Sequence, residues 1–157
     1  SFGSGAALLL KDTPYGRSKN EIAQVLRETK NFYNLQIFSV FDENELPTRF
    51  IRSGITACLS GNAIRVYGDR KFDFFYMKDL LTLVDYYLNS NSPPKEKFSL
   101  CDVGGMIENL SGTSVPMEIL DVYIPDYCTD NYNLPFEPIG LKQGIAETFG
   151  CLSCQPR

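Results

Sequence analysis

Hydrophobic positions along the chain switch repeatedly between the spacing of a helix and that of a strand. Between residue 15 and about residue 31, apolar side chains recur every three or four positions, which is typical of one face of a helix. Thr13 and Pro14 precede this run, and together they predict its start. A Thr side chain can cap the free amides of a helix, and Pro fits the first helical turn.

The remaining segments alternate in the same way. Five runs rich in β-branched and aromatic residues predict strands, at 35–41, 63–66, 72–77, 98–103 and 115–122, the last interrupted by Pro116. Four further runs with helical spacing predict helices, at 48–61, 79–89, 106–111 and 141–149. We expect residues 1–7 to be flexible and residues 90–95 to form a polar loop. Alternating strands and helices indicate an α/β fold.

Composition and charge narrow the class of protein. With 157 residues and 43% hydrophobic residues, the chain is long enough for a domain with its own core. The net charge of −4 and the scattered Lys and Arg residues argue against nucleic-acid binding. No apolar run approaches the ~20 residues that span a bilayer. We therefore expect no membrane association and a cytoplasmic location.

The cysteines and the missing histidines limit the possible chemistry. Five cysteines at irregular spacing do not suggest a disulfide framework, and Cys151 and Cys154 alone match half of a zinc knuckle or a redox pair. The chain has no His, so we expect no metal site and no Ser-His or Cys-His nucleophile. Acid/base chemistry must then use Tyr, Lys, Asp, Glu or Cys.

The pair formed by Tyr15 and Lys19 is the strongest candidate for such chemistry. The two residues are four positions apart at the start of the predicted helix, so both side chains leave the same face. An ammonium beside a phenol favours the phenolate, which suits Tyr15 to act as a general acid/base. The alternative is an ordinary amphipathic helix with an exposed Lys.

The aromatic residues of the segment 72–76 allow two interpretations. They could form a platform on which bases stack. Packing of a strand into the core explains the same residues more simply, and we predict the latter for Phe72, Phe74, Phe75 and Tyr76.

Five segments together resemble the extended short-chain dehydrogenase/reductase family, in particular its nucleotide-sugar epimerases and dehydratases. They follow one another in the family's order and span most of the chain: 4–6, 14–19, 47–51, 68–79 and 140–145. The resemblance implies part of a Rossmann-like doubly wound sheet plus a small C-terminal substrate-binding α+β portion. It implies that residues 1–103 are the second half of the Rossmann-like domain and that residues 104–157 belong to the substrate domain.

The resemblance also implies a site. Ser4, Tyr15 and Lys19 match the family's catalytic Ser-Tyr-Lys, in which Tyr is the acid/base, Ser binds the same substrate oxygen, and Lys supports Tyr. Tyr15 and Lys19 would also contact the cofactor, NAD or NADP, with Lys19 holding the nicotinamide ribose. Thr48, Arg49 and Ser39 would contact a nucleotide-sugar substrate. A homodimer is implied too, formed through a helix pair that includes residues 15–30.

The sequence departs from the family at several points. It contains no Gly-x-Gly-x-x-Gly turn, so the dinucleotide-binding half is expected to be absent, and only 11 positions separate Ser4 from Tyr15. Ser39 stands where relatives have Asn, Asp42 where they have Gly, and Phe72 where many have a phosphate-binding Arg.

These departures leave alternatives open. Three explanations compete. The sequence consists of segments of a longer chain, it is a truncated relative that has lost cofactor binding, or it is a fragment that pairs with a separate nucleotide-binding partner. The function is accordingly an NAD(P)-dependent nucleotide-sugar enzyme or a non-catalytic binding or scaffold relative on the same fold. An unrelated α/β domain is the third interpretation.

Overall fold

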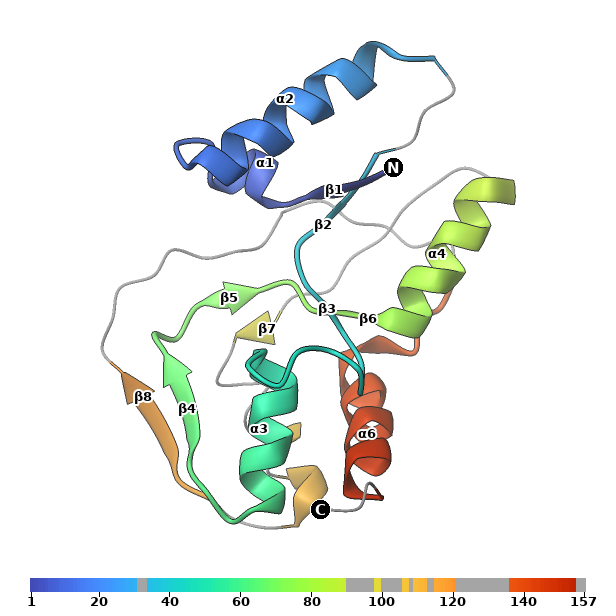
Figure 1. Cartoon of the computed structure of the whole chain (residues 1–157). Helices are drawn as coiled ribbons and strands as arrows, with labels where there is room; N and C mark the ends of the chain where they lie inside the picture. Colours follow the sequence, from blue (N-terminus) through green and yellow to red (C-terminus); the bar gives the residue numbers. More distant parts are fainter. Residues whose placement is uncertain are drawn as a thin grey trace.

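The computed structural model describes residues 1–30, 34–89, 98–99, 106–107, 109–112, 115–120 and 136–154. Within these ranges helices and short strands alternate, which confirms the α/β prediction (Figure 1). The strands are β1 (Phe2–Ser4), β2 (Leu35–Ile37), β3 (Val40–Phe41), β4 (Ile64–Tyr67), β5 (Lys71–Phe72), β6 (Phe75–Tyr76), β7 (Phe98–Ser99) and β8 (Met117–Leu120). The helices are α1 (Ala6–Leu9), α2 (Pro14–Glu28), α3 (Phe50–Leu59), α4 (Met77–Asn89) and α6 (Gly140–Ser153).

Three of the four strand pairs in the described residues are parallel. β1 pairs with β2, β3 with β6, and β4 with β8, whereas β5 and β7 are antiparallel. Parallel neighbours need a crossover connection, and α1 and α2 supply it between β1 and β2. This is Rossmann-like architecture, as the family resemblance implies.

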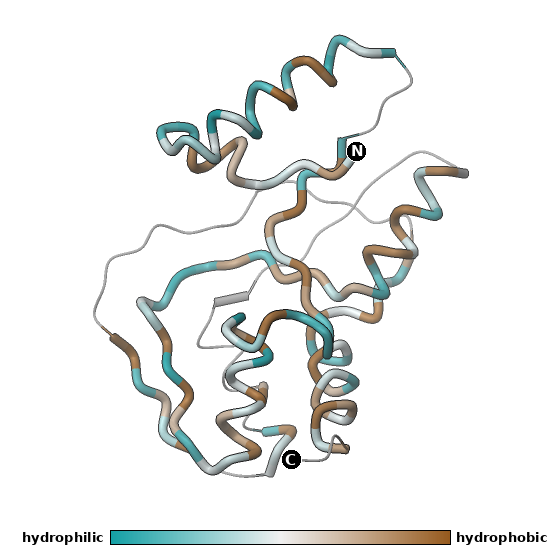
Figure 2. The backbone as a smooth tube through the Cα atoms, in the orientation of Figure 1, coloured by the Kyte–Doolittle hydropathy of each residue, from teal (hydrophilic) through white to brown (hydrophobic). Residues whose placement is uncertain are grey.

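The core lies where α3 and α6 pack together beside β4 (Figure 1). Ile51 and Ile55 of α3, Ile145 of α6 and Phe41 of β3 are almost completely buried. Along β4, buried and exposed residues alternate, and Figure 2 shows the matching alternation of hydrophobic and hydrophilic positions. One face of this strand therefore covers the core.

The prediction that residues 1–7 are flexible is wrong. Residues 1–7 are not a flexible lead-in, because β1 and the start of α1 lie within them. β1 pairs with β2 in the register Phe2↔Leu35, and this pairing orders its backbone. Sequence periodicity misses a strand of three residues containing Gly3, which offers almost no pattern.

Two predicted strands are each divided in the structure. Residues 35–41 form β2 and β3, which pair with different partners, and the chain bends between them. Residues 71–76 form β5 and β6 separated by residues 73–74, and α4 already begins at Met77. Phe41 and Tyr76 are buried and the other apolar residues of these runs are half-buried, but the runs do not show which neighbour satisfies the backbone.

The other elements follow the predictions closely. α2 begins at Pro14 with Thr13 as its cap, whose Oγ1 accepts a hydrogen bond from the amide of Gly16 at 3.0 Å. α3 and β8 lie inside their predicted ranges, and α6 extends four residues beyond residue 149. Residues 90–95 and 100–103 lie outside the described residues. None of the described helices is both long enough and apolar enough to cross a membrane.

Core packing is confirmed for two of the four aromatic residues of this segment: Tyr76 is part of the core and Phe74 packs against it, whereas Phe72 and Phe75 are half-buried. Tyr76 is buried, and its ring centre lies 5.3 Å from that of Phe41. Phe74 meets Phe41 edge to face, with ring centres 6.5 Å apart, and Phe72 lies 5.1 Å from Phe74. The contacts of Tyr76 and Phe74 with Phe41 are core packing and do not form a stacking platform.

A buried carboxylate joins α4 to α6. The two carboxylate oxygens of Asp79 accept hydrogen bonds from the amides of Ile139, at 2.8 Å, and Gly140, at 3.0 Å. Asp79 is 3% exposed, and Gly140 has a φ of 77°, which favours glycine. A negative charge at the N-terminus of a helix is stabilised by the helix dipole. Asp79 therefore stabilises the start of α6 and its contact with α4.

A second polar contact supports the same packing. The hydroxyl of Tyr76 donates to Oε2 of Glu147 at 3.0 Å, and Nζ of Lys78 donates to the same oxygen at 2.6 Å. Burial raises the pKa of Tyr76 to about 12, and the hydrogen bond to Glu147 adds to this rise. Tyr76 therefore remains a neutral hydrogen-bond donor at physiological pH.

Candidate active site

The carboxyl ends of β1 and β2 lie at the same edge of their parallel pair. Ser4 is the last residue of β1 and pairs with Ile37, the last residue of β2. The amide of Gly5 continues the ladder by donating to the carbonyl of Ile37 at 2.9 Å. Ser39 follows two residues later, so this edge carries two of the residues singled out in the sequence. Ligands of open α/β sheets bind at this edge.

Ser4 has a structural role as well as a candidate chemical one. Its Oγ accepts a hydrogen bond from the amide of Ala6 at 3.2 Å, which satisfies one of the free amides at the start of α1. The hydroxyl hydrogen remains available for donation to another oxygen. The short helix α1, of four residues, lies in the interval between Ser4 and Tyr15.

Tyr15 and Lys19 lie on the first turns of α2, which packs on α1 (Figure 1). Gly16 of α2 lies directly against the end of α1, where an added Cβ would overlap the carbonyl oxygen of Leu10. Nζ of Lys19 lies over the ring of Tyr15, 5.6 Å from its centre, and Tyr15 is 57% exposed. The structure thus brings the predicted pair together, with the ring accessible.

The structure records no hydrogen bond between Ser4 and Tyr15 among residues 1–30. Among the described residues, the side chain of Ser4 contacts the backbone of Ala6, and the side chain of Lys19 contacts the ring of Tyr15. A substrate oxygen could approach both hydroxyls from solvent, because the Tyr15 side chain is largely exposed. The Ser-Tyr-Lys set therefore stays a prediction.

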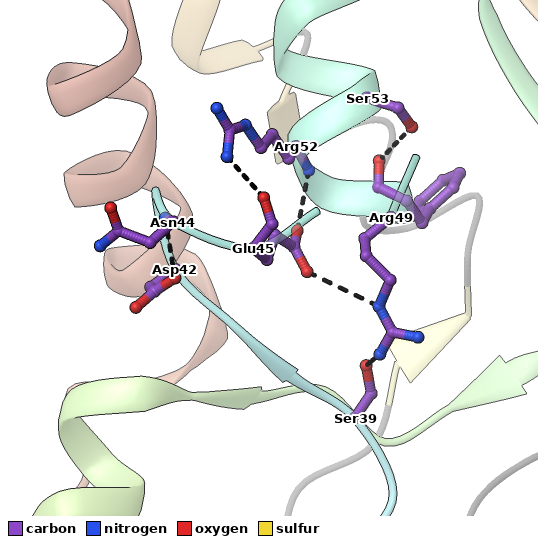
Figure 3. A network of polar contacts seen from close by, with 8 residues as sticks. Ser39, Asp42, Asn44, Glu45, Arg49, Arg52 and Ser53 are labelled. Atoms are coloured by element: carbon purple, nitrogen blue, oxygen red, sulfur yellow. Dashed lines mark hydrogen bonds and ion pairs between the residues drawn. The ribbon is translucent and has the colours of Figure 1, made fainter. Parts of the chain in front are cut away.

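Ser39 and Arg49, two of the three predicted substrate residues, are in direct contact (Figure 3). Nη2 of Arg49 donates to Oγ of Ser39 at 3.1 Å. Ser39 is buried, whereas the Arg49 side chain is 48% exposed. Thr48, the third predicted residue, is exposed beside Arg49. Arg49 therefore presents a guanidinium, fixed at one end by Ser39, toward solvent.

Glu45 completes this group, although no sequence motif singles it out. Its Oε2 lies 3.9 Å from Nε of Arg49, and its Oε1 accepts a hydrogen bond from the amide of Arg52 at 3.0 Å. The backbone carbonyl of Glu45 accepts from Nη1 of Arg52 at 2.5 Å. Both residues lie before α3, in loop and turn backbone, so the helical spacing rule does not apply to them and no local sequence pattern identifies the contact.

The environment of Glu45 is unusual for a carboxylate. Burial raises its pKa to about 7, against the opposing effects of the hydrogen bond from Arg52 and the positive charge of Arg49. The negative charge of Asp42 contributes to the rise, and the charge of Arg52 opposes it. Glu45 therefore changes its charge near neutral pH.

The positions that depart from the family have identifiable contacts. Asp42 accepts a hydrogen bond from the amide of Asn44 at 2.8 Å, an Asx turn that shapes the loop before α3. The guanidinium carbon of Arg70 lies 4.8 Å from the ring centre of Phe72, so an arginine lies beside the position where many relatives have one. Among the described residues, no three His, Cys, Asp or Glu side chains gather to hold a metal ion.

Comparison with protein families gives one match. Residues 7–101 match the sequence profile of the NAD dependent epimerase/dehydratase family. The matched range includes Tyr15 and Lys19 of α2 and also Arg49, whereas Ser4 precedes it. A comparison with curated proteins found no match.

Solved structures share the fold at low sequence identity. The dTDP-glucose 4,6-dehydratase of Bacillus anthracis, in complex with NAD, is 19% identical with a TM-score of 0.70, over 88% of this chain and 51% of that one. The UDP-glucuronic acid 4-epimerase of Bacillus cereus, in complex with UDP-glucuronic acid and NAD, is 18% identical with a TM-score of 0.67, over 88% and 52%. TunA, an NAD-dependent NDP-hexosamine 5,6-dehydratase involved in tunicamycin biosynthesis, is 16% identical with a TM-score of 0.75, over 99% and 63%. The chain thus spans about half to three fifths of these proteins.

Proposed function

Because the chain belongs to the NAD dependent epimerase/dehydratase family, we propose that it forms the catalytic and substrate-binding part of an enzyme that epimerises or dehydrates a nucleotide sugar with NAD. The contact between Lys19 and Tyr15 carries this proposal. It lies within the family match, on a largely exposed ring, at the N-terminal end of a helix. An exposed phenol with an adjacent ammonium is suited to exchange a proton with a sugar hydroxyl.

Each residue has a role in the proposed reaction. Tyr15 takes the proton from a sugar hydroxyl and returns it, and the positive charge of Lys19 stabilises the phenolate between these steps. Ser4 donates its hydroxyl hydrogen to the same substrate oxygen while its own oxygen still accepts from Ala6. These side chains hold the reacting oxygen and move its proton.

The residues present fit the reactive end of the cofactor. Tyr15 and Lys19 would lie beside the nicotinamide ribose, since both extend from one face of α2 and the Tyr15 side chain is largely exposed. NAD, when bound, supplies the acceptor for a hydride from the sugar carbon. The described residues contain no Gly-x-Gly-x-x-Gly turn, so the pyrophosphate would be held by groups outside them.

Arg49 would bind the diphosphate of the substrate. A guanidinium offers several N–H donors in a plane that matches phosphate oxygens, and one of them already contacts Ser39. The half-exposed side chain leaves the other edge of the guanidinium for a ligand. Thr48, exposed beside it, would add a hydroxyl contact.

Pairing of two copies through α2 is part of the proposal. Ile22 and Val25 lie three positions apart on this helix and are 48% and 67% exposed. Apolar side chains at that spacing form one stripe, which a second helix could cover. Light scattering on eluted size-exclusion peaks should give a dimer mass.

The test uses the full-length gene product. Its thermal stability is measured with NAD and with NADP, and its turnover with NAD and each of UDP-glucose, UDP-glucuronic acid and dTDP-glucose, products being identified by NMR. We expect a rise in melting temperature with cofactor and conversion of at least one sugar. No shift at millimolar concentration of either cofactor, together with no conversion, would favour the non-catalytic alternative.

A further inference from the structure

Arg49 is held on two sides, by groups from different parts of the chain. Ser39, from the bend between β2 and β3, accepts from Nη2 at 3.1 Å. Glu45, from the loop before α3, faces Nε at 3.9 Å (Figure 3). Two contacts at different nitrogens define the plane of a guanidinium, whereas one contact leaves it free to rotate.

Glu45 is itself held firmly. Its side chain is only 9% exposed, and one carboxylate oxygen and the backbone carbonyl both contact Arg52. The carboxylate therefore stays in place whether or not Arg49 contacts it. A fixed, nearly buried anion beside the half-exposed Arg49 can restrain the cation, but the cation has little hold on the anion.

We propose that Glu45 is a positioning residue that orients the guanidinium of Arg49 for the diphosphate of the nucleotide-sugar substrate. The proposal rests on the proposed function, in which Arg49 binds that diphosphate. An arginine side chain loses considerable rotamer freedom when a ligand immobilises it. Glu45 and Ser39 impose most of that loss before the ligand arrives, which strengthens binding.

The two contacts of the Glu45 carboxylate differ in their dependence on charge. At 3.0 Å the contact with the Arg52 amide is a hydrogen bond, which a neutral amide oxygen can also accept. At 3.9 Å the contact with Nε of Arg49 is too long for a hydrogen bond and depends on the negative charge. Glu45→Gln should therefore release Arg49 while keeping the loop attached to α3.

Because the contact with Arg49 depends on the negative charge of Glu45, the orientation of Arg49 should depend on pH. The charged groups that act on Glu45 are Asp42 on its own loop and Arg49 and Arg52 at the start of α3. Glu45 gains its charge as pH rises through about 7, so Arg49 should be oriented above that pH and released below it. The phosphates of a nucleotide sugar stay fully ionised over this range, so the ligand adds no titration of its own.

The experiment measures the dissociation constant of a nucleotide sugar by calorimetry, on the full-length protein with NAD, from about pH 5.5 to about pH 8. The probe is whichever of UDP-glucose, UDP-glucuronic acid and dTDP-glucose the wild type binds. We expect wild-type affinity to rise about three- to tenfold as pH increases through 7. Glu45→Gln should bind at the weak, low-pH level throughout, and Glu43→Gln, in the same loop, should match the wild type.

A variant pair separates this inference from the proposed function. Arg49→Ala should weaken binding strongly, and adding Glu45→Gln to it should cost nothing more, because Glu45 acts only through Arg49. If Arg49→Ala weakens binding but the wild-type affinity is independent of pH, or Glu45→Gln binds as tightly as the wild type or more tightly, the positioning role is wrong and the proposed function stands. If no probe binds, or Arg49→Ala binds normally, Arg49 does not bind a diphosphate, and both proposals fail at that point. The wild-type pH profile decides the question even if Glu45→Gln does not fold.

Discussion

Nζ of Lys19 lies over the ring of Tyr15, 5.6 Å from its centre. The ammonium therefore contacts the face of the ring through a cation–π interaction. Both residues lie on the first turns of α2, so the helix itself fixes their separation and no tertiary contact is needed to bring them together. The proposed acid/base pair is consequently present before any ligand binds.

Tyr15→Phe should abolish turnover and leave the fold intact. The change removes only the hydroxyl of a ring that is 57% exposed, so we expect unfolding free energy to change by less than about 1 kcal/mol. Loss of a general acid/base should reduce the rate at least about 10²- to 10⁴-fold. Steady-state kinetics and urea unfolding of the full-length protein measure the two quantities. A variant that kept more than about a tenth of wild-type turnover would show that Tyr15 is not the acid/base.

Lys19→Ala and Ser4→Ala should differ from this variant in informative ways. Lys19→Ala should reduce the rate and also weaken NAD binding, since the ammonium would serve both Tyr15 and the ribose. Ser4→Ala should have the mildest kinetic effect, because water can replace part of a lost hydroxyl, but it also removes the hydrogen bond from the Ala6 amide. We expect it to cost about 1 kcal/mol of stability, read from the same urea curves.

Gly16→Ala should strongly destabilise the protein. The added Cβ would overlap the carbonyl oxygen of Leu10, and a backbone atom cannot move aside without separating α1 from α2. We expect a loss of about 2–4 kcal/mol in chemical denaturation. Gly150→Ala is the matched control: nothing lies within 4 Å of its Cβ position, and Ala favours the interior of α6, so stability should rise by about 0.5–1 kcal/mol. Equal losses in both variants would contradict the close packing of α1 on α2.

Asp79→Ala should loosen α6. The variant leaves the amides of Ile139 and Gly140 without their carboxylate acceptor and removes a favourable charge at the helix N-terminus. We expect a loss of about 2–4 kcal/mol. Hydrogen exchange should show faster opening of α6 than of α2. Asp12→Ala, at an exposed position, should change stability by no more than about 0.5 kcal/mol.

Glu45 should make the wild type less stable as pH rises. Its pKa in the folded protein, about 7, lies above its ordinary value of 4.5, so the folded state binds the proton more tightly than the unfolded state. This contribution to stability is complete below about pH 4.5 and is lost as pH rises through about 7. The difference in unfolding free energy between wild type and Glu45→Gln should change by roughly 2–3 kcal/mol over that window. Glu43→Gln should show no such change, and a wild type that gained stability relative to Glu45→Gln with rising pH would contradict the burial of the carboxylate.

The sequence predicts the helices better than the strands. α2 was predicted from its own residues, because Thr13, Pro14 and the apolar spacing are local signals. β2 and β3 were predicted as one strand, since the bend at Phe38 depends on the positions of β1 and β6, which lie far away in the chain. Strands of two or three residues depend on their partners more than on their own composition.

The candidate site divides in the same way. Tyr15 and Lys19 are neighbours along one helix, so their spacing alone predicts their contact. Ser39 and Arg49 were grouped only through a family resemblance, although the structure joins them directly. The altered pKa of Glu45 arises mainly from burial, a property of the folded loop that no local pattern contains.

The hydrogen bonds from Ile139 and Gly140 to Asp79 close loops of 60 and 61 residues. The entropy lost on closing such a loop grows only with the logarithm of its length, so doubling the length would cost about 0.6 kcal/mol more. Residues inserted between the described elements of this loop should therefore cost little free energy of unfolding, as long as Asp79 still reaches the start of α6. Homologues of different length can therefore keep the contact between Asp79 and the start of α6. A segment inserted within the loop should be tolerated, whereas a single substitution of Asp79 should not.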